Sequence, residues 1–201
     1  SARLKVDPGV VLKFSSSRIE TEMGGHLIAE GTQNAPVIFT SLFDDRYGAG
    51  GTFDTSNDKS STSAAAGNWS GLSLGPLAKA SLDWARVYYA GGLSSIEGSS
   101  ATFNPIEIRQ ADARITNSLF EYNAAQAAGN RNGRGWTDDS TIFIRGSQPV
   151  IVGNIFLNNQ GAVMSIDAGA MSANVTADWG RSTPNPEASA GASGESLPLG
   201  A

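Results

Sequence analysis

The chain has 201 residues, 19 acidic side chains against 14 lysines and arginines, and no cysteine. This length is enough for one domain with a sizeable core. The net charge of −5 argues against a nucleic-acid partner, because there is no basic stripe to displace the counterions of a phosphate backbone. Without cysteine no thiolate metal site can form. Without an apolar run of about 18 residues we expect no membrane span.

The first forty residues predict short strands separated by glycine and proline turns. Residues 10–14 alternate between apolar and other side chains, as expected of a half-buried strand. Ile19 and Met23 are expected to face the interior, and residues 36–40 form the next strand. His26, the single histidine, is expected to be an ordinary exposed strand residue. No signal peptide precedes the first strand pattern, which indicates a mature or excised segment of a larger protein.

Two stretches rich in small and polar residues interrupt the strand pattern. Residues 44–68 and 124–139 predict long insertions, and residues 91–104 form another small-residue connection. The strand pattern ends after Ile166. Residues 172–201 predict a flexible tail or linker rich in Pro, Ala, Gly and Ser.

An internal repeat organises the middle of the chain. Residues 142–159 (IFIRGSQPVIVGNIFLNN) align without a gap on residues 106–123 (IEIRQADARITNSLFEYN), 36 positions earlier. An earlier copy is found at residues 72–74 and 82–90. The identical pairs are Ile106/Ile142, Ile108/Ile144, Arg109/Arg145, Ile115/Ile151, Phe120/Phe156 and Asn123/Asn159.

The period of the repeat is shorter than 36 residues. Met164 and Ile166 repeat the pair Ile142 and Ile144, 22 positions further on. We therefore interpret the repeat as a rung of about 22 residues, lengthened in one copy by the insertion at 124–139.

Such rungs of short alternating strands predict an all-β fold, a right-handed parallel β-helix of roughly five to six coils. The spacing I-x-x-N/S-x-F-x-x-N resembles the right-handed β-helix repeats of the pectin-lyase-like superfamily over about residues 4–166. The strings GVVLKF, LIAEGT and PVIFTS resemble segments of very large secreted bacterial surface proteins. The predicted β-helix domain covers residues 1–171.

The first insertion is a candidate calcium loop. Asp54, Ser56 and Asp58 place oxygen ligands at every second residue, as at the start of a calcium-binding loop. Asp44 and Asp45 could complete the shell from the other end of the insertion. The alternative is a solvated polar loop, because Lys59 stands where such loops carry glycine and no glutamate follows.

Pairs of neighbouring acids are the candidate catalytic groups. Polysaccharide-cleaving β-helix enzymes use carboxylates in an outer groove, which points to Asp44–Asp45 and Asp138–Asp139. The Asn-Thr-Asp and His-Gly stretches of the family's hydrolases are absent. Arg109 and Arg145 occupy one repeat position and are expected to face outward on neighbouring rungs. There they either pair with Glu107 and loop acids or bind an acidic sugar.

Asn123 and Asn159 are predicted to form a structural ladder, each amide bonding to the neighbouring rung inside a turn. The repeat also assigns six aromatic residues to the core or to stacks, although exposed members could contact sugar rings. They are Trp84, Tyr88, Tyr89, Phe120, Tyr122 and Phe156.

We therefore expect a non-catalytic structural or adhesive module of an extracellular or cell-surface bacterial protein, with no required cofactor. The expected partners are a polysaccharide and further β-helix coils that stack on its open ends. The alternatives are a carbohydrate-active enzyme of the lyase or hydrolase type and a sugar-binding module. Convergence of carboxylates, or of carboxylates with Arg109 or Arg145, in one groove would distinguish them.

Overall fold

The computed structural model describes residues 2–47, 54–59, 61–125, 129–130 and 136–167. The predicted tail at 172–201 lies outside these residues, as does part of each predicted insertion. The described residues form β-strands and no helix. The described residues contain no helix long and apolar enough to cross a membrane.

Fifteen of the strands form three parallel sheets of five strands each. Sheet A consists of β1 (Arg3–Val6), β4 (His26–Glu30), β7 (Lys79–Asp83), β12 (Asp112–Thr116) and β17 (Val150–Val152). Sheet B consists of β2 (Val11–Phe14), β5 (Val37–Ser41), β8 (Ala85–Tyr88), β13 (Leu119–Glu121) and β18 (Ile155–Leu157). Sheet C consists of β3 (Arg18–Thr21), β6 (Gly71–Leu74), β11 (Ile106–Arg109), β16 (Ser140–Arg145) and β19 (Ala162–Asp167).

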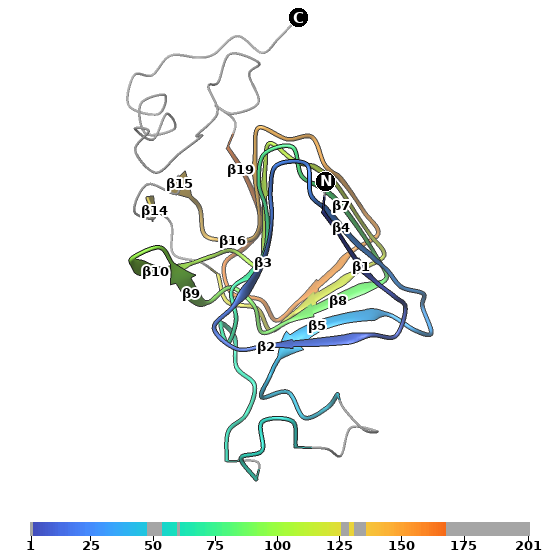
Figure 1. Ribbon diagram of the computed structural model, residues 1–201, viewed down its shortest axis with the longest axis vertical. Helices are drawn as coiled ribbons and strands as arrows, with labels where there is room; N and C mark the ends of the chain where they lie inside the picture. Colours follow the sequence, from blue (N-terminus) through green and yellow to red (C-terminus); the bar gives the residue numbers. More distant parts are fainter. Residues whose placement is uncertain (1, 48–53, 60, 126–128, 131–135, 168–201) are drawn as a thin grey trace, which may run out of the picture.

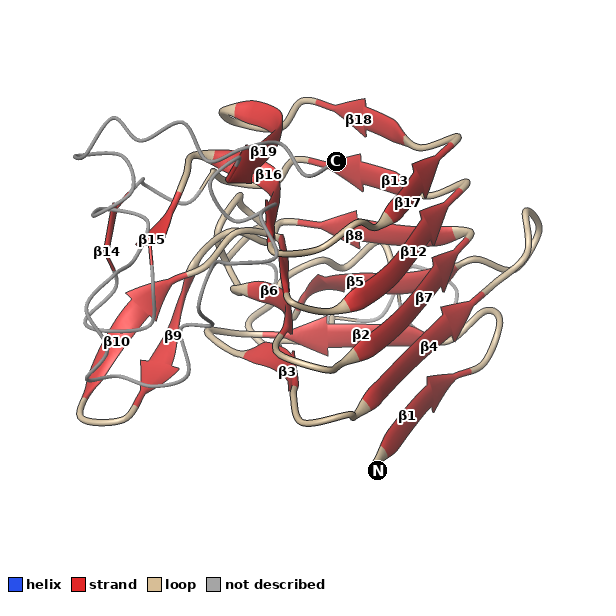
Figure 2. Cartoon of the chain, turned by 90° about the horizontal axis from the view of Figure 1, so that it is seen from above, coloured by secondary structure: helices blue, strands red, loops and turns tan. Residues whose placement is uncertain are grey.

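The chain visits the sheets in the order A, B, C and then begins again one strand further along each sheet. We call each set of three successive strands a coil, so the described chain contains five coils. Figure 1 looks along the stack and shows the three sheets as the sides of a triangle, and Figure 2 shows the coils side by side. This all-β, parallel arrangement is consistent with a parallel β-helix.

The strand register confirms the alignment of the repeat. Ile106 pairs with Leu72 on one side and with Ile142 on the other. Ile115 pairs with Ile151, and Phe120 pairs with Phe156. The shorter period is confirmed as well, because Ile142 pairs with Met164 of β19.

The inward side chains of all three sheets form one hydrophobic core. Ile108, Ile115 and Phe120 are fully buried in it, whereas Ile151 and Phe156 of the fifth coil are partly buried. The Phe120 and Phe156 rings stack with centroids 4.9 Å apart. A residue of an end coil has a neighbouring coil on one side, which explains the difference in burial.

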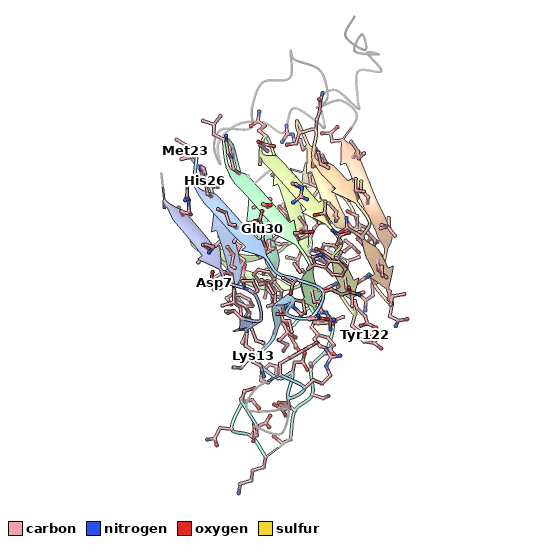
Figure 3. The ribbon with its side chains drawn as sticks, turned by 90° about the vertical axis from the view of Figure 1, so that its right-hand side faces the viewer. Asp7, Lys13, Met23, His26, Glu30 and Tyr122 are labelled. Atoms are coloured by element: carbon pink, nitrogen blue, oxygen red, sulfur yellow. The ribbon has the colours of Figure 1, made fainter. Side chains whose placement is uncertain are left out.

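The inward position expected for Met23 is wrong. Met23 has a φ of 51° and lies in the turn after β3, with its side chain 74% exposed. Figure 3 shows it at the outer edge of the sheets. Alternation of period two does not continue into a turn, so the residue after the strand loses its inward direction. His26 lies on β4 and is half-buried.

Three insertions leave the sheets at the same corner, between sheet B and sheet C. They connect β5 to β6, β8 to β11 and β13 to β16. The connection expected at 91–104 contains an antiparallel hairpin of β9 (Leu93–Ile96) and β10 (Ser99–Thr102). The third insertion holds a second short pair, β14 (Gly129–Asn130) and β15 (Trp136–Thr137). Figure 2 shows both hairpins on the same side of the stack.

Candidate functional site

All four tyrosines of the chain gather around Arg46 at the corner where the insertions begin, and Arg86 bonds to Tyr47 and Tyr88 beside them. We call Arg46, Tyr47, Tyr88, Tyr89 and Tyr122 the tyrosine–arginine cluster. Successive ring centroids lie 5.9, 6.3 and 5.8 Å apart along the order of the chain. The Arg46 guanidinium carbon lies 5.5 Å from the Tyr47 ring centroid, 4.8 Å from that of Tyr88 and 5.3 Å from that of Tyr89.

The parallel stack explains how tyrosines far apart in the sequence meet. Tyr88 ends β8 on the outer face of sheet B, where it pairs with Glu121 of β13. Tyr89 and Tyr122 directly follow these two strands, so they lie one coil apart. Their ring spacing of 5.8 Å is close to the distance between neighbouring strands. Tyr47 comes from the first insertion and stacks on Tyr88.

Tyr89 and Tyr122 hold a left-handed backbone, with φ of 60° and 57°. In the fifth coil the same corner position is Asn158, with φ of 53°. Asparagine tolerates this region well, whereas a bulky aromatic residue is an outlier there. Such strain costs on the order of 1–3 kcal/mol, and it recurs at other turns of the stack, as at Leu77 and Trp84.

Asp44 holds Arg46 over the rings. Its buried carboxylate accepts hydrogen bonds from Arg46 Nε at 2.8 Å, Arg46 Nη2 at 2.9 Å and Thr40 Oγ1 at 2.5 Å. Burial opposes ionisation of Asp44, but the bonds from Arg46 and Thr40 outweigh it and hold the carboxyl pKa below its ordinary value. Bonding to Asp44 likewise raises the pKa of the Arg46 guanidinium, so both groups are charged at neutral pH.

The cluster combines a buried tyrosine with an exposed end. Tyr88 is buried, and its hydroxyl receives a hydrogen bond from Tyr47 at 3.3 Å. Burial raises the pKa of Tyr88 well above its ordinary value, so the phenol is neutral and is both a donor and an acceptor. Tyr122, at one end of the row of rings, is 39% exposed, and Arg46 is also exposed. Figure 3 labels Tyr122 and Lys13 on the side where the first insertion leaves the sheets.

The exposed end offers aromatic faces, phenol hydroxyls and a guanidinium within one patch. Tyrosine supplies rigid amphipathic contact area at low entropic cost. Arginine supplies several donors in a fixed fork. This combination recognises a ligand that has both apolar faces and hydroxyl or acidic groups.

The acids predicted to bind calcium lie in two groups within the first insertion. Asp45 accepts long hydrogen bonds from the amide and hydroxyl of Thr55, at 3.4 Å each. Asp54 accepts hydrogen bonds from the amides of Asp58 and Lys59 and from the Ser56 hydroxyl. Within the described ranges, no three His, Cys, Asp or Glu side chains are grouped so that they could hold one metal ion.

Lys13 joins the start of the insertion to its far side. Its ammonium donates to the Asp44 backbone carbonyl and to Thr55 Oγ1, both at 2.6 Å. Desolvation lowers the pKa of Lys13, although Asp44 and Asp45 act in the opposite direction. The base of the first insertion is therefore attached to sheet B beside the tyrosine–arginine cluster.

The acid pair Asp138–Asp139 lies at the end of the third insertion, whereas Asp44 and Asp45 belong to the first. The Asp138 carboxylate accepts a hydrogen bond from the Asp139 amide. The Asp138 carbonyl accepts one from the buried side chain of Asn104. These contacts fix the turn that leads into β16.

Arg109 and Arg145 are neighbours across β11 and β16, but they do not lie along the open surface. Arg145 is 4% exposed, and Arg109 pairs with the buried carboxylate of Glu107 at 3.4 Å. The Arg145 guanidinium lies 3.9 Å from the Asp167 carboxylate of the neighbouring strand β19. Arg18 of β3 donates to Ser94 of the β9–β10 hairpin at 3.0 Å, which attaches that hairpin to the sheet.

Asn123 and Asn159 are hydrogen-bonded across neighbouring coils. The Asn159 side-chain oxygen accepts from the Asn123 amide at 3.0 Å and from the Asn123 side-chain nitrogen at 2.8 Å. The buried side chain of Asn123 also accepts from Ala90 N and donates to Val87 O. A similar pair, Ser118 and Asn154, lies at the corner between sheets A and B.

Sequence reasoning missed the tyrosine–arginine cluster. It assigned Tyr88, Tyr89 and Tyr122 to the core or to stacks by repeat position, which did not predict their contact with Arg46. Arg46 and Tyr47 lie in an insertion without a repeat mate. The tyrosine content was the available signal, since three of the four tyrosines fall at one corner of the repeat.

Comparisons with protein-family models, with curated proteins and with solved structures found no match to this chain.

Proposed function

We propose that the chain is a non-catalytic adhesive module of an extracellular or cell-surface bacterial protein, and that it binds a polysaccharide at the tyrosine–arginine cluster. Its fold in this proposal is a right-handed parallel β-helix of the pectin-lyase-like kind. Three parallel sheets with one strand per coil, and the resemblance of the repeats, support that assignment.

The observation that carries the binding proposal is the Tyr89–Tyr122 stack. Its rings are parallel to within 10°, their centroids are 5.8 Å apart, and the stack ends at an exposed ring. A sugar ring has an apolar C–H face that suits an aromatic platform and hydroxyls that suit the phenol and guanidinium groups nearby.

Charge at the cluster favours binding over bond cleavage. Glycoside hydrolysis uses two carboxyl groups, one of them protonated so that it can act as an acid. The Asp44 carboxyl is instead kept ionised, because bonds from Arg46 and Thr40 lower its pKa and because it faces the Arg46 guanidinium. Asp44 is therefore unsuited to be the protonated carboxyl that a hydrolase uses as its acid.

The test is titration of the protein with polygalacturonate, alginate and a neutral glucan, with reducing ends and unsaturated products measured in parallel. We expect one of these polymers to bind without being cleaved, and Tyr122→Ala to weaken that binding by about 3- to 10-fold. Leu77→Ala is the matched control, because Leu77 is exposed at a different corner. Turnover that disappears in Asp44→Ala or Asp138→Ala would instead support the enzyme alternative.

The ends of the stack favour a further structural role, in which modules join end to end. In the described sheets β1, β2 and β3 each pair with one strand, so their other edges present backbone N–H and C=O groups. We expect light scattering to detect association that grows with concentration. A monomer whose first coil is covered by its own residues would contradict this role.

A further inference from the structure

The outer face of sheet A lies opposite the corner where the three insertions leave the stack (Figure 1). Leu27, Ala29 and Leu82 point into the core, so the residues that alternate with them point outward. The register places these outward residues in rows that cross the strands. Figure 3 labels His26 and Glu30, the first and last residues of β4, on this face.

Two of the rows carry opposite charge. One crosses the starts of the first three strands of the sheet, and the other crosses their ends. The basic row consists of Arg3, His26 and Lys79, and the acidic row consists of Asp7, Glu30 and Asp83. About 13 Å separates the rows, because they are four residues apart along each strand. In the fourth coil the same two positions carry Asp112 and Thr116.

A middle row runs between them, and over all three rows the charges cancel. The middle row consists of Lys5, Ile28, Ser81, Arg114 and Val150. The cations are Arg3, Lys5, Lys79 and Arg114, and the acids are Asp7, Glu30, Asp83 and Asp112, with His26 neutral. A polyanion therefore finds no net positive field on this face. Separated rows of opposite charge are instead complementary to the same face of a second copy that is turned around.

One symmetry operation produces this complementarity. A two-fold axis that lies in the contact plane, parallel to the stack, reverses the strand direction but keeps the order of the coils. It places the basic row of one copy opposite the acidic row of the other, so that His26 faces Glu30 and Lys79 faces Asp83. Each pair occurs twice, as in any isologous interface. A two-fold axis parallel to the strands would instead place the basic rows against each other.

The middle row lies on this axis, where each residue meets its own copy. Ile28 is half-buried and Val150 is 52% exposed, so both bring apolar surface to the contact. Like charges meet at Lys5 and at Arg114, but each has a carboxylate of its own chain beside it. Lys5 pairs with Asp7 at 2.8 Å, and Arg114 lies close enough to Asp83 to stabilise its charge.

We propose that the outer face of sheet A binds a second copy of the chain, face to face, about the two-fold axis parallel to the stack. Exposed ion pairs contribute little each, so the dimer is weak. Both stacks run in the same direction in this pair, and their open ends stay free. The pairing does not depend on polysaccharide binding, but it places two tyrosine–arginine clusters in one particle, which strengthens attachment to a polymer with repeated sites.

The test uses single cysteines in the full chain, which has no native cysteine, together with a short bismaleimide cross-linker. Ile28→Cys lies on the axis, so its thiol meets the same thiol of the second copy. Lys79→Cys is the matched control, because it is more exposed but lies off the axis. We expect Ile28→Cys to give at least tenfold more cross-linked dimer than Lys79→Cys. An equal or larger yield from Lys79→Cys would overturn the proposal, since random collision or end-to-end joining does not bring two Ile28 residues together.

The charge rows are tested in the Ile28→Cys background. His26→Glu and Glu30→Lys should each lower the yield of cross-linked dimer about 3- to 10-fold, and mixing the two variants should restore it, because the new glutamate then faces the new lysine. Lys59→Glu, an exposed change in the first insertion, should leave the yield unchanged. Yields that ignore His26→Glu and Glu30→Lys would contradict the pairing of the rows. Polygalacturonate binding that is lost in Lys79→Glu, without any dimer, would make this face a polyanion site and overturn the proposal.

Discussion

The ring of Tyr89 lies parallel to the ring of Tyr122 one coil away, and both residues keep the left-handed backbone that favours glycine and asparagine. The two residues therefore combine a strained backbone with an ordered pair of aromatic rings. In the fifth coil Asn158 occupies the same position without an aromatic ring. The corner thus does not require tyrosine for its geometry, and the ring itself needs a separate reason.

The backbone strain at Tyr122 can be measured apart from the loss of its ring. Tyr122→Gly and Tyr122→Ala both remove the ring, but alanine keeps a Cβ in the left-handed region. We expect the glycine variant to be more stable than the alanine variant by about 1 kcal/mol in urea unfolding. At Glu121, inside β13, the order should reverse, because glycine weakens a strand. Equal stability of the two Tyr122 variants would show that the corner is unstrained.

Core substitutions should cost more in the middle of the stack than at its end. Ile115→Ala removes a fully buried side chain that pairs with coils on both sides, and we expect a loss of about 2–5 kcal/mol. Ile151→Ala, at the paired position of the fifth coil, should cost less because that side chain is partly buried. Chemical unfolding of both variants checks the order. An equal or larger loss at Ile151 would contradict the assigned burial.

The Asn123 side chain should stabilise the fold through its hydrogen bonds to neighbouring coils. Asn123→Ala leaves the Ala90 amide and the Val87 carbonyl without this partner inside the structure. We expect a loss of about 1–3 kcal/mol in unfolding free energy. Hydrogen exchange should locate the change, with faster exchange at Ala90 and little change in sheet A. Uniform loss of protection throughout the chain would point to general unfolding instead.

Acid should destabilise the tyrosine–arginine cluster through Asp44. The pKa of Asp44 is lower in the folded protein than its ordinary value of 3.8, so its stabilisation is complete above that value and is lost as the pH falls below it. Asp44→Asn should therefore lower the melting temperature at neutral pH and remove part of the acid dependence. Asp7→Asn is a control, because its ion pair with Lys5 is exposed. Parallel pH profiles for the wild type and Asp44→Asn would refute this assignment.

Calcium binding in the first insertion is a separate prediction. If the ion binds there, Asp54 and Asp58 are the expected ligands, and bound calcium stabilises the fold by mass action. A chelator should then lower the melting temperature, and Asp58→Ala should abolish the difference. The competing expectation follows from the backbone bonds of Asp54, which stabilise the turn without an ion. Identical melting curves with and without the chelator would exclude a structural calcium site.

The stack of strands could be predicted from the sequence because the residues that repeat are the ones that pair across neighbouring strands. Ile106 and Ile142 are both isoleucine because they occupy one inward row, where shape and burial restrict the choice. No such rule applies to the insertions, which have no repeat mates. The position of Arg46 depends on its bond to Asp44, and both residues lie in the first insertion. The repeat pattern therefore predicts no contacts between segments that lie outside the repeat.

Because all three insertions lie at one corner, the length of the chain between coils can vary without changing the strand register. Along one inward row the sequence distance between paired residues is 34 from Leu72 to Ile106, 36 from Ile106 to Ile142 and 22 from Ile142 to Met164, yet the register never shifts. This corner therefore tolerates additions and deletions that the other two would transmit to the core. We therefore expect insertions and deletions among related chains to concentrate at this corner. For protein engineering, this corner is a site where a foreign peptide can be inserted without redesigning the sheets beneath it.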